Sequence, residues 1–130
     1  MHFNRLNISL LSILCFTTMV SFAQSQNKRR ILLFTDVGNN ALVLQQKQIL
    51  ESDEAGCLDR DIVIETYVLD QTDKKVLKKY TISTAPFTFL LIGKDGHVAL
   101  RSYKIVSKEQ LFALIDGMPM RRDEMRRKRN

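Results

Sequence analysis

The most constraining feature of this chain is a run of four apolar residues, Ile31-Leu32-Leu33-Phe34, which ends at Thr35-Asp36. A strand without a polar face is buried on both sides, as parallel strands covered by helices are. Residues 61–69 are likewise β-branched and apolar on both alternating faces. The two segments predict buried parallel strands, joined through the intervening helix as a right-handed βαβ unit.

Two helices are predicted beside these strands. Residues 41–54 favour a helix with Leu42, Ile49 and Leu50 on one face, and Gly56 is its expected stop. Thr72 or Asp73 caps a second, shorter helix. In that helix we expect three side chains to meet the sheet and four lysines to face water: Val76, Leu77 and Tyr80, and Lys74, Lys75, Lys78 and Lys79.

The C-terminal half predicts a hairpin and a last helix. Pro86 opens a strand over residues 87–92, and the Gly93-Lys94-Asp95-Gly96 turn leads into an antiparallel strand over residues 97–102. Ser107 begins a capping box, and apolar residues then recur at helical spacing on the expected buried face: Leu111, Leu114, Ile115 and Met118. The order is therefore βαβαββα, an α/β sandwich with a mixed four-stranded sheet.

The first 23 residues have the pattern of a secretory signal peptide. Residues 1–5 are weakly basic, residues 6–20 are mostly apolar, and Ser21-Phe22-Ala23 is a small-x-small cleavage site. The apolar run is shorter than a spanning helix needs and is interrupted by polar residues. We therefore expect a cleaved signal peptide over residues 1–23, one domain over residues 24–120 and a basic tail over residues 121–130, in a periplasmic or secreted protein.

Cysteine and charge counts narrow the chemistry further. Cleavage would remove Cys15 and leave Cys57 as the single thiol, so no intramolecular disulfide could form. Of the remaining charge, six basic and two acidic residues lie in the last ten positions, which leaves the domain itself nearly neutral. This distribution does not indicate a nucleic-acid groove, and no nucleic-acid partner is expected.

Several short motifs resemble known proteins. The element order and the spacing of Tyr80 and Pro86 resemble thioredoxins. More narrowly, four segments resemble the bacterial DUF4174 family, a domain of unknown function: Arg30-Ile31-Leu32-Leu33, Arg60-Asp61-Ile62-Val63, Phe87 to Gly96, and Met118-Pro119-Met120-Arg121-Arg122. The resemblance implies a thioredoxin-like framework that lacks the redox cysteines.

The departure from thioredoxin lies in the loop after the first strand. Thiol–disulfide exchange needs a thiolate at the start of the first helix, with a resolving thiol within one turn. Asp36-Val37-Gly38-Asn39-Asn40 fills that place. Two-cysteine redox catalysis and one-cysteine peroxidase chemistry are therefore excluded at this loop.

Five residues are candidate ligand-binding groups. Asp36, Asn39 and Asn40 follow the first strand at the carboxyl end of the sheet, where open α/β sheets often bind ligands, although Asn39 or Asn40 also suits a helix N-cap. Pro86 holds the position that is a cis proline in thioredoxins, and the sequence leaves cis and trans open. Arg101 is the fifth candidate.

Other reactive side chains suit simpler roles. A lone Cys57 beside a helix end is typical of an inert small hydrophobe, and His97 has no partnered nucleophile in its hairpin. One histidine and one cysteine after signal removal give poor support for a metal site. We expect no metal, no cofactor and no catalytic residue.

The leading hypothesis is an exported, non-catalytic thioredoxin-like module that binds a protein or envelope partner. Its basic tail could add weak contact with anionic surfaces. The alternative is an enzyme of unknown reaction that uses Asp36 or Arg101 as a polar site at the vacated active-site end. Neither the ligand nor the oligomeric state follows from the sequence.

Overall fold

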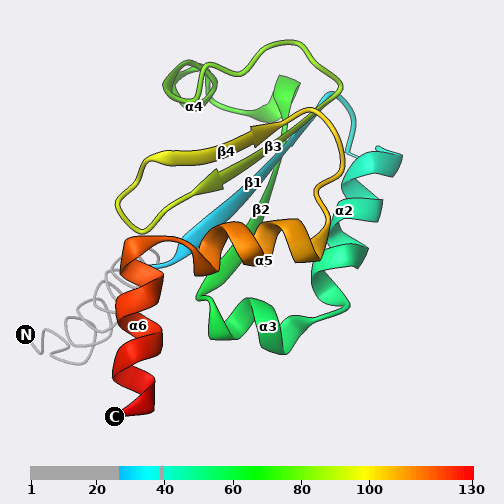
Figure 1. The fold of residues 1–130 in the computed structure, drawn as a ribbon. Helices are drawn as coiled ribbons and strands as arrows, with labels where there is room; N and C mark the ends of the chain where they lie inside the picture. Colours follow the sequence, from blue (N-terminus) through cyan, green and yellow to red (C-terminus); the bar gives the residue numbers. More distant parts are fainter. Residues whose placement is uncertain (1–26, 39) are drawn as a thin grey trace, which may run out of the picture.

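The computed structural model describes residues 27–38 and 40–130, and the expected signal peptide and Asn39 lie outside them. Figure 1 shows the order of the elements. They are β1 (Arg29–Thr35), α2 (Ala41–Glu51), α3 (Glu54–Asp59), β2 (Ile62–Val68), a 3-10 turn (Leu69–Gln71), α4 (Lys74–Lys79), β3 (Phe87–Ile92), β4 (Val98–Ser102), α5 (Lys108–Asp116) and α6 (Pro119–Arg129). None of the helices in this described part is long and apolar enough to cross a membrane.

The four strands form one mixed sheet in the order β2-β1-β3-β4. Strand β2 is parallel to β1, while β3 is antiparallel to both β1 and β4. The α/β fold with a mixed four-stranded sheet is therefore confirmed. We name the two ends of the sheet after the ends of β1: the Arg29 end, where the β3–β4 turn also lies, and the Thr35 end, where β3 begins.

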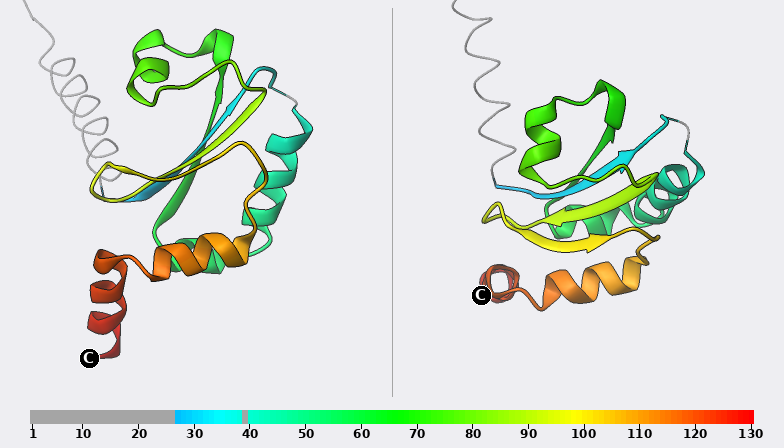
Figure 2. Two further views of the ribbon diagram at one scale, coloured as in Figure 1. Left: turned by 45° about the horizontal axis from the view of Figure 1, so that its top comes forward. Right: turned by 90° about the horizontal axis from the view of Figure 1, so that it is seen from above.

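Alternating residues of the central strands pack into two separate hydrophobic cores, one on each face of the sheet. Ile31, Leu33 and Phe89 face α2, α3 and α5, while Leu32, Phe34 and Leu90 face α4 and its flanking turns. Figure 2 shows the sheet between these helices. The apolar run of β1 is buried at every position because helices cover both of its faces.

Helix α4 covers its face only in part. A six-residue helix is about 9 Å long, whereas a seven-residue strand such as β1 spans about 23 Å. Asp73 caps α4, and Val76, Leu77 and Tyr80 pack on the sheet as expected. The α4 face of the sheet therefore continues past Tyr80, toward the Arg29 end, where none of the helices in residues 27–38 and 40–130 lies above it.

Three expectations are wrong in detail. Gly56 is not the stop of the first helix, because α2 already ends at Glu51. Gly56 lies inside α3, whose N-cap Asp53 accepts a hydrogen bond from the Gly56 N–H. Strand β2 is an edge strand and is only half-buried. Leu114 is 38% exposed, because Leu111 and Ile115 set the buried face of α5 and Leu114 lies about 100° around the helix from Ile115.

The expected basic tail is part of another helix. Pro119 occupies the first turn of α6, where a missing N–H is tolerated, and the helix continues to Arg129. Figure 1 shows α6 extending away from the sheet at the Arg29 end. Arg121 is buried, so this segment is attached to the domain by its own side chains.

Candidate functional site

The loop at the Thr35 end is held closed by its own polar groups. The Asp36 carboxylate accepts hydrogen bonds from the Val37 N–H at 2.9 Å and from Asn40 Nδ2 at 3.3 Å. Asn40 Nδ2 also donates to the Pro86 carbonyl at 3.2 Å, and the Asp36 N–H donates to the same oxygen at 3.4 Å. The structure thus brings three predicted site residues together, but their polar groups bind one another.

Asn40 also begins the helix. Its Oδ1 accepts a hydrogen bond from the Leu42 N–H at 2.9 Å, which confirms Asn40 as the N-cap of α2. The peptide bond before Pro86 is trans. This side chain therefore fastens the start of α2 to the start of β3.

Arg101 is not part of this group. From β4, its Nη2 donates to the Tyr80 carbonyl at 2.5 Å and its Nη1 to the Thr81 carbonyl at 3.4 Å. These carbonyls follow the last turn of α4, where unpaired backbone acceptors need donors. Arg101 holds the C-terminus of α4 on the sheet.

Cys57 lies in α3, buried against the core and away from the loop at the Thr35 end. Its Sγ is 3.5 Å from the Leu50 carbonyl, and burial raises the pKa of its thiol. A raised pKa disfavours the thiolate that exchange chemistry needs. Within residues 27–38 and 40–130, no three His, Cys, Asp or Glu side chains are grouped to hold a metal ion.

The Arg29 end carries a dense group of ion pairs, which we call the ion cluster: Lys28, Arg29, Asp59, Arg60, Asp61, Lys94, Asp116, Arg121, Glu124 and Lys128. Arg29, only 1% exposed, donates through both terminal nitrogens to Glu124 at 3.2 Å. Lys94 Nζ lies 2.8 Å from Glu124 and 2.7 Å from Asp61. One carboxylate of α6 thus pairs with a buried cation of β1 and with a cation of the β3–β4 turn.

Arg121 anchors the other side of α6. It is 2% exposed and pairs with Asp59 and, at 3.1 Å, with Asp116. Arg60 donates to the same Asp116 carboxylate at 3.1 and 2.6 Å. Hydrogen bonds from Lys128 and Arg121 lower the pKa of Asp59 to about 2.

The other carboxylates of the ion cluster are also held ionised. Burial alone would raise the pKa of Asp61, Asp116 and Glu124, but hydrogen bonds from neighbouring lysines and arginines outweigh it and lower all three. Three of the segments that carry the family resemblance, at Arg60-Asp61, Lys94 and Arg121, meet here. The sequence motifs therefore converge on one end of the fold.

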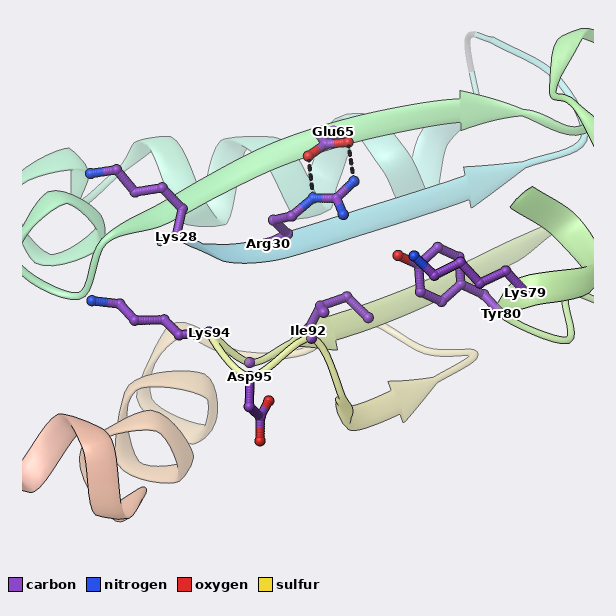
Figure 3. A pocket seen from close by; sticks show the side chains of 10 residues that line it. Lys28, Arg30, Glu65, Lys79, Tyr80, Ile92, Lys94 and Asp95 are labelled. Carbon is purple, nitrogen blue, oxygen red and sulfur yellow. Dashed lines mark hydrogen bonds and ion pairs between the residues drawn. The ribbon is translucent and has the colours of Figure 1, made fainter. Parts of the chain in front are cut away.

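Next to the ion cluster, the uncovered α4 face of the sheet forms a cavity of about 570 Å³. We call it the basic pocket. It is lined by Lys28, Arg30, Glu65, Lys79, Tyr80, Ile92 and the turn residues Gly93 to Gly96. Figure 3 shows Arg30, Tyr80 and Lys79 along it, with Asp95 directed away from them.

Arg30 and Glu65 form the wall of the basic pocket. Arg30 Nε and Nη2 donate to the two carboxylate oxygens of Glu65 at 2.7 and 2.8 Å, a bidentate pair. The Tyr67 hydroxyl donates to Glu65 as well, at 2.5 Å. The hydrogen bond from Arg30, opposed by burial and aided by Tyr67, lowers the pKa of Glu65. Glu65 is therefore a fully engaged carboxylate.

None of these pocket residues was a predicted site residue. One signal was present in the sequence: Glu65 is the single charged residue in the strand now seen over Ile62–Val68, and a charge inside a strand requires a partner. That Arg30 is the partner follows only from the parallel register of β1 and β2. The cavity itself depends on how far α4 reaches along the sheet.

Solved structures place this fold in a known class. A malarial protein superposes with a TM-score of 0.53 at 20% identity, over 69% of this chain and 96% of that protein. Thioredoxin-2, a component of malaria parasite protein secretion machinery, superposes with a TM-score of 0.54 at 18% identity, over 71% of this chain and 84% of that protein. The reduced 2-Cys peroxiredoxin of Plasmodium vivax superposes with a TM-score of 0.55 at 13% identity, over 75% of this chain and 81% of that protein. The chain thus has a thioredoxin-like fold.

The family assignment is narrower. The family model called Domain of unknown function (DUF4174) matches residues 21–124, and the chain belongs to this family. No curated protein matches the chain. The matched segment includes the basic pocket and, apart from Lys128, all of the ion cluster.

Proposed function

We propose that this chain is an exported, non-catalytic binding module built on a thioredoxin-like fold. The observation that carries the proposal is the loop at the Thr35 end, where Asp36 and Asn40 occupy the place of redox cysteines and bind each other and Pro86. Cys57 is buried, with a raised pKa. Both features argue against thiol chemistry.

Binding is supported by the opposite end of the sheet. The basic pocket is within the size range of small-molecule sites and is lined by polar groups from three strands or turns and one helix. A loop whose polar groups are already paired offers less to a ligand than this cavity does. The binding surface is therefore proposed at the Arg29 end.

Disulfide reduction and peroxide consumption by the full chain, compared with its Cys57→Ser variant, test the absence of catalysis. Both proteins should match the buffer blank. Turnover that the Cys57→Ser change abolishes would overturn the proposal, and so would turnover of any substrate that an Asp36→Ala change abolishes. The latter result would favour the enzymatic alternative.

Export is a separate part of the proposal and has its own test. Ser21-Phe22-Ala23 follows the apolar run, so secreted material should begin at or near Gln24. Mass analysis of the N-terminus in the native host measures this directly. An intact Met1 on the accumulated protein would contradict export by a cleaved signal.

A partner in the cell envelope fits this location, with helix α6 as a second contact. Its Arg122, Arg126 and Arg129 recur at positions i, i+4 and i+7 and are exposed. They lie on the side of α6 opposite Glu124 and Lys128, which face the domain. We propose weak, salt-sensitive contact of this arginine stripe with anionic surfaces.

A further inference from the structure

We propose that the basic pocket binds a small oxyanion, such as a phosphate group, between Arg30, Lys79 and Tyr80. The inference deepens the proposed function, on which it rests, by naming the ligand class. It is carried by three hydrogen-bond donors that line one cavity and that the rest of the described chain leaves uncommitted.

Arg30 contributes an unused edge. Its Nε and Nη2 are committed to Glu65, whereas Nη1 makes no hydrogen bond to any of the described residues. A guanidinium fixed on one edge cannot rotate, so its remaining N–H groups point in a set direction. Glu65 therefore orients Arg30 and leaves Nη1 available to a ligand.

Lys79 and Tyr80 supply the other two donors from the end of α4. The Lys79 ammonium lies 5.1 Å from the centre of the Tyr80 ring and, within the described chain, has no carboxylate partner. Tyr80 is buried, and Figure 3 shows its hydroxyl and the Lys79 ammonium both directed toward the pocket. Among the described residues the hydroxyl makes no hydrogen bond of its own. An anion here would receive donors from β1 and from α4.

The acidic residues of the pocket do not compete for this position. Glu65 is occupied by Arg30 and Tyr67. Asp95 is directed away, and its carboxylate accepts a hydrogen bond from the His97 N–H at 3.1 Å. Lys28 and Lys94 line the far part of the cavity, but both pair with Asp61. The uncompensated positive charge is thus at Lys79, while Arg30, whose charge Glu65 offsets, contributes the N–H groups of Nη1.

The test follows the backbone amide resonances of the full chain during titration with inorganic phosphate. Saturable shifts are expected around the pocket, at Ile92, Gly93 and Tyr80. Lys79→Gln should weaken the affinity about tenfold, and Tyr80→Phe by several-fold, because each removes one donor to a charged group. Lys78→Gln is the matched control, since Lys78 is an exposed neighbour on α4 that does not line the cavity.

Two further arms identify the source of the anion. Methyl phosphate tests for a phosphate monoester, and vesicles containing phosphatidylglycerol test for a lipid headgroup. Binding in any arm that Lys79→Gln weakens and Lys78→Gln does not supports the site. Absence of saturable shifts in all arms, or equal weakening by both lysine variants, overturns it.

The phosphate titration can fail without contradicting the proposed function, and the reverse also holds. A chain that binds no phosphate but also reduces no disulfide loses only the ligand assignment made here. A chain that reduces a disulfide through Cys57 loses the proposed non-catalytic role, whatever the pocket binds. Thermal unfolding of each variant, which should match the unchanged chain because Lys79 is exposed and Tyr80→Phe removes only an unbonded hydroxyl, checks that affinity losses are local.

Discussion

At both ends of the sheet polar side chains find partners within the protein, but by different kinds of interaction. At the Thr35 end, Asp36 and Asn40 satisfy polar groups of their own loop and of Pro86 with short-range hydrogen bonds. At the Arg29 end, side chains far apart in the sequence meet as ion pairs, such as Arg29 with Glu124. Apart from its hydrogen bonds to Pro86, the first end is held within one turn of the chain, whereas the second depends on side chains as far apart in the sequence as Arg29 and Glu124.

The loop after β1 and the Arg29 end also differ in the side chains that they bring together. In the loop after β1, Asn40 caps α2 and binds the Pro86 carbonyl, and Asp36 accepts hydrogen bonds from Val37 and Asn40. The charged groups gather at the opposite end, where α4 is too short to cover the sheet. This stretch of sheet forms a pocket because α4, the helix that the described residues place on this face, ends before it.

The largest expected effect comes from breaking the ion cluster at Glu124. Glu124→Ala leaves Arg29 buried without a carboxylate partner, while Lys94 keeps its pair with Asp61, and an unpaired buried charge costs about 3–5 kcal/mol. Urea unfolding measures the free energy of unfolding. Asp123→Ala, next to it on α6, removes only an exposed pair with Arg126 and should change that free energy by less than about 1 kcal/mol. Equal effects of the two variants would contradict the anchoring role of Glu124.

Acid should weaken the same end of the molecule. The pKa values of Asp59, Asp61, Asp116 and Glu124 are lower in the folded chain than the ordinary values of about 4 expected after unfolding. Their contribution is therefore complete above about pH 4.5 and is lost as pH falls toward 2, the value near which Asp59 titrates.

Urea midpoints between pH 7 and pH 2 measure this loss. We expect little change down to about pH 5 and a steep fall below about pH 4. Asp59→Asn keeps an oxygen acceptor but removes one titrating group, so its fall should be shallower. A midpoint that stays constant to pH 2 would show that the ion cluster does not stabilise the fold.

These two tests concern features that the sequence could not reveal. The apolar run at Ile31, the N-cap at Asn40 and the capping box at Ser107 are local patterns, and each predicted its element correctly. The sequence also contains basic residues at positions 28–30 and in its last ten positions, but these two groups are about 90 residues apart along the chain. That a carboxylate at Glu124 lies between cations of the sheet depends on the path of the whole chain.

The helix errors have a similar cause. A glycine usually follows the end of a helix, but Gly56 lies inside α3. Asp53 caps this second helix, and its carboxylate accepts a hydrogen bond from the Gly56 N–H. Leu114 fits the helical spacing as well as Leu111 does, but it lies about 100° around α5 from Ile115 and is exposed. Periodicity identifies a helix more reliably than it identifies which edge of the apolar face is covered.

A smaller effect is expected at the Thr35 end. Asn40→Ala removes the N-cap of α2 and the bond to the Pro86 carbonyl, and should cost about 1 kcal/mol, or slightly more. Asn40→Ser keeps a capping oxygen but loses the donor to Pro86, so its loss should be smaller. Gln45→Ala, exposed within α2, is the control and should be nearly neutral. If Asn40→Ala proves as neutral as Gln45→Ala, the loop is not braced as described.

The smallest effect on stability should come from the arginine stripe of α6. Its residues, Arg122, Arg126 and Arg129, are exposed, and the simplest role for Arg126 and Arg129, which lie in the last helical turn, is to offset the negative end of the helix dipole. Replacing all three by glutamine should leave the unfolding free energy within about 1 kcal/mol of the unchanged chain.

Binding to anionic surfaces separates the stripe from mere net charge. Each basic residue near an anionic membrane contributes about 1 kcal/mol to binding. The triple variant should therefore be released from anionic vesicles at a lower salt concentration than the unchanged chain. Near 0.5 M salt, where charges are strongly screened, neither protein should remain bound. Truncation at Met120 would not be a clean test, because it also removes Arg121 and Glu124 from the ion cluster. The matched control converts Lys74, Lys75 and Lys78, on the exposed face of α4, to glutamine. If both triple variants are released at the same salt concentration, the surface responds to overall charge, and α6 has no special place in binding.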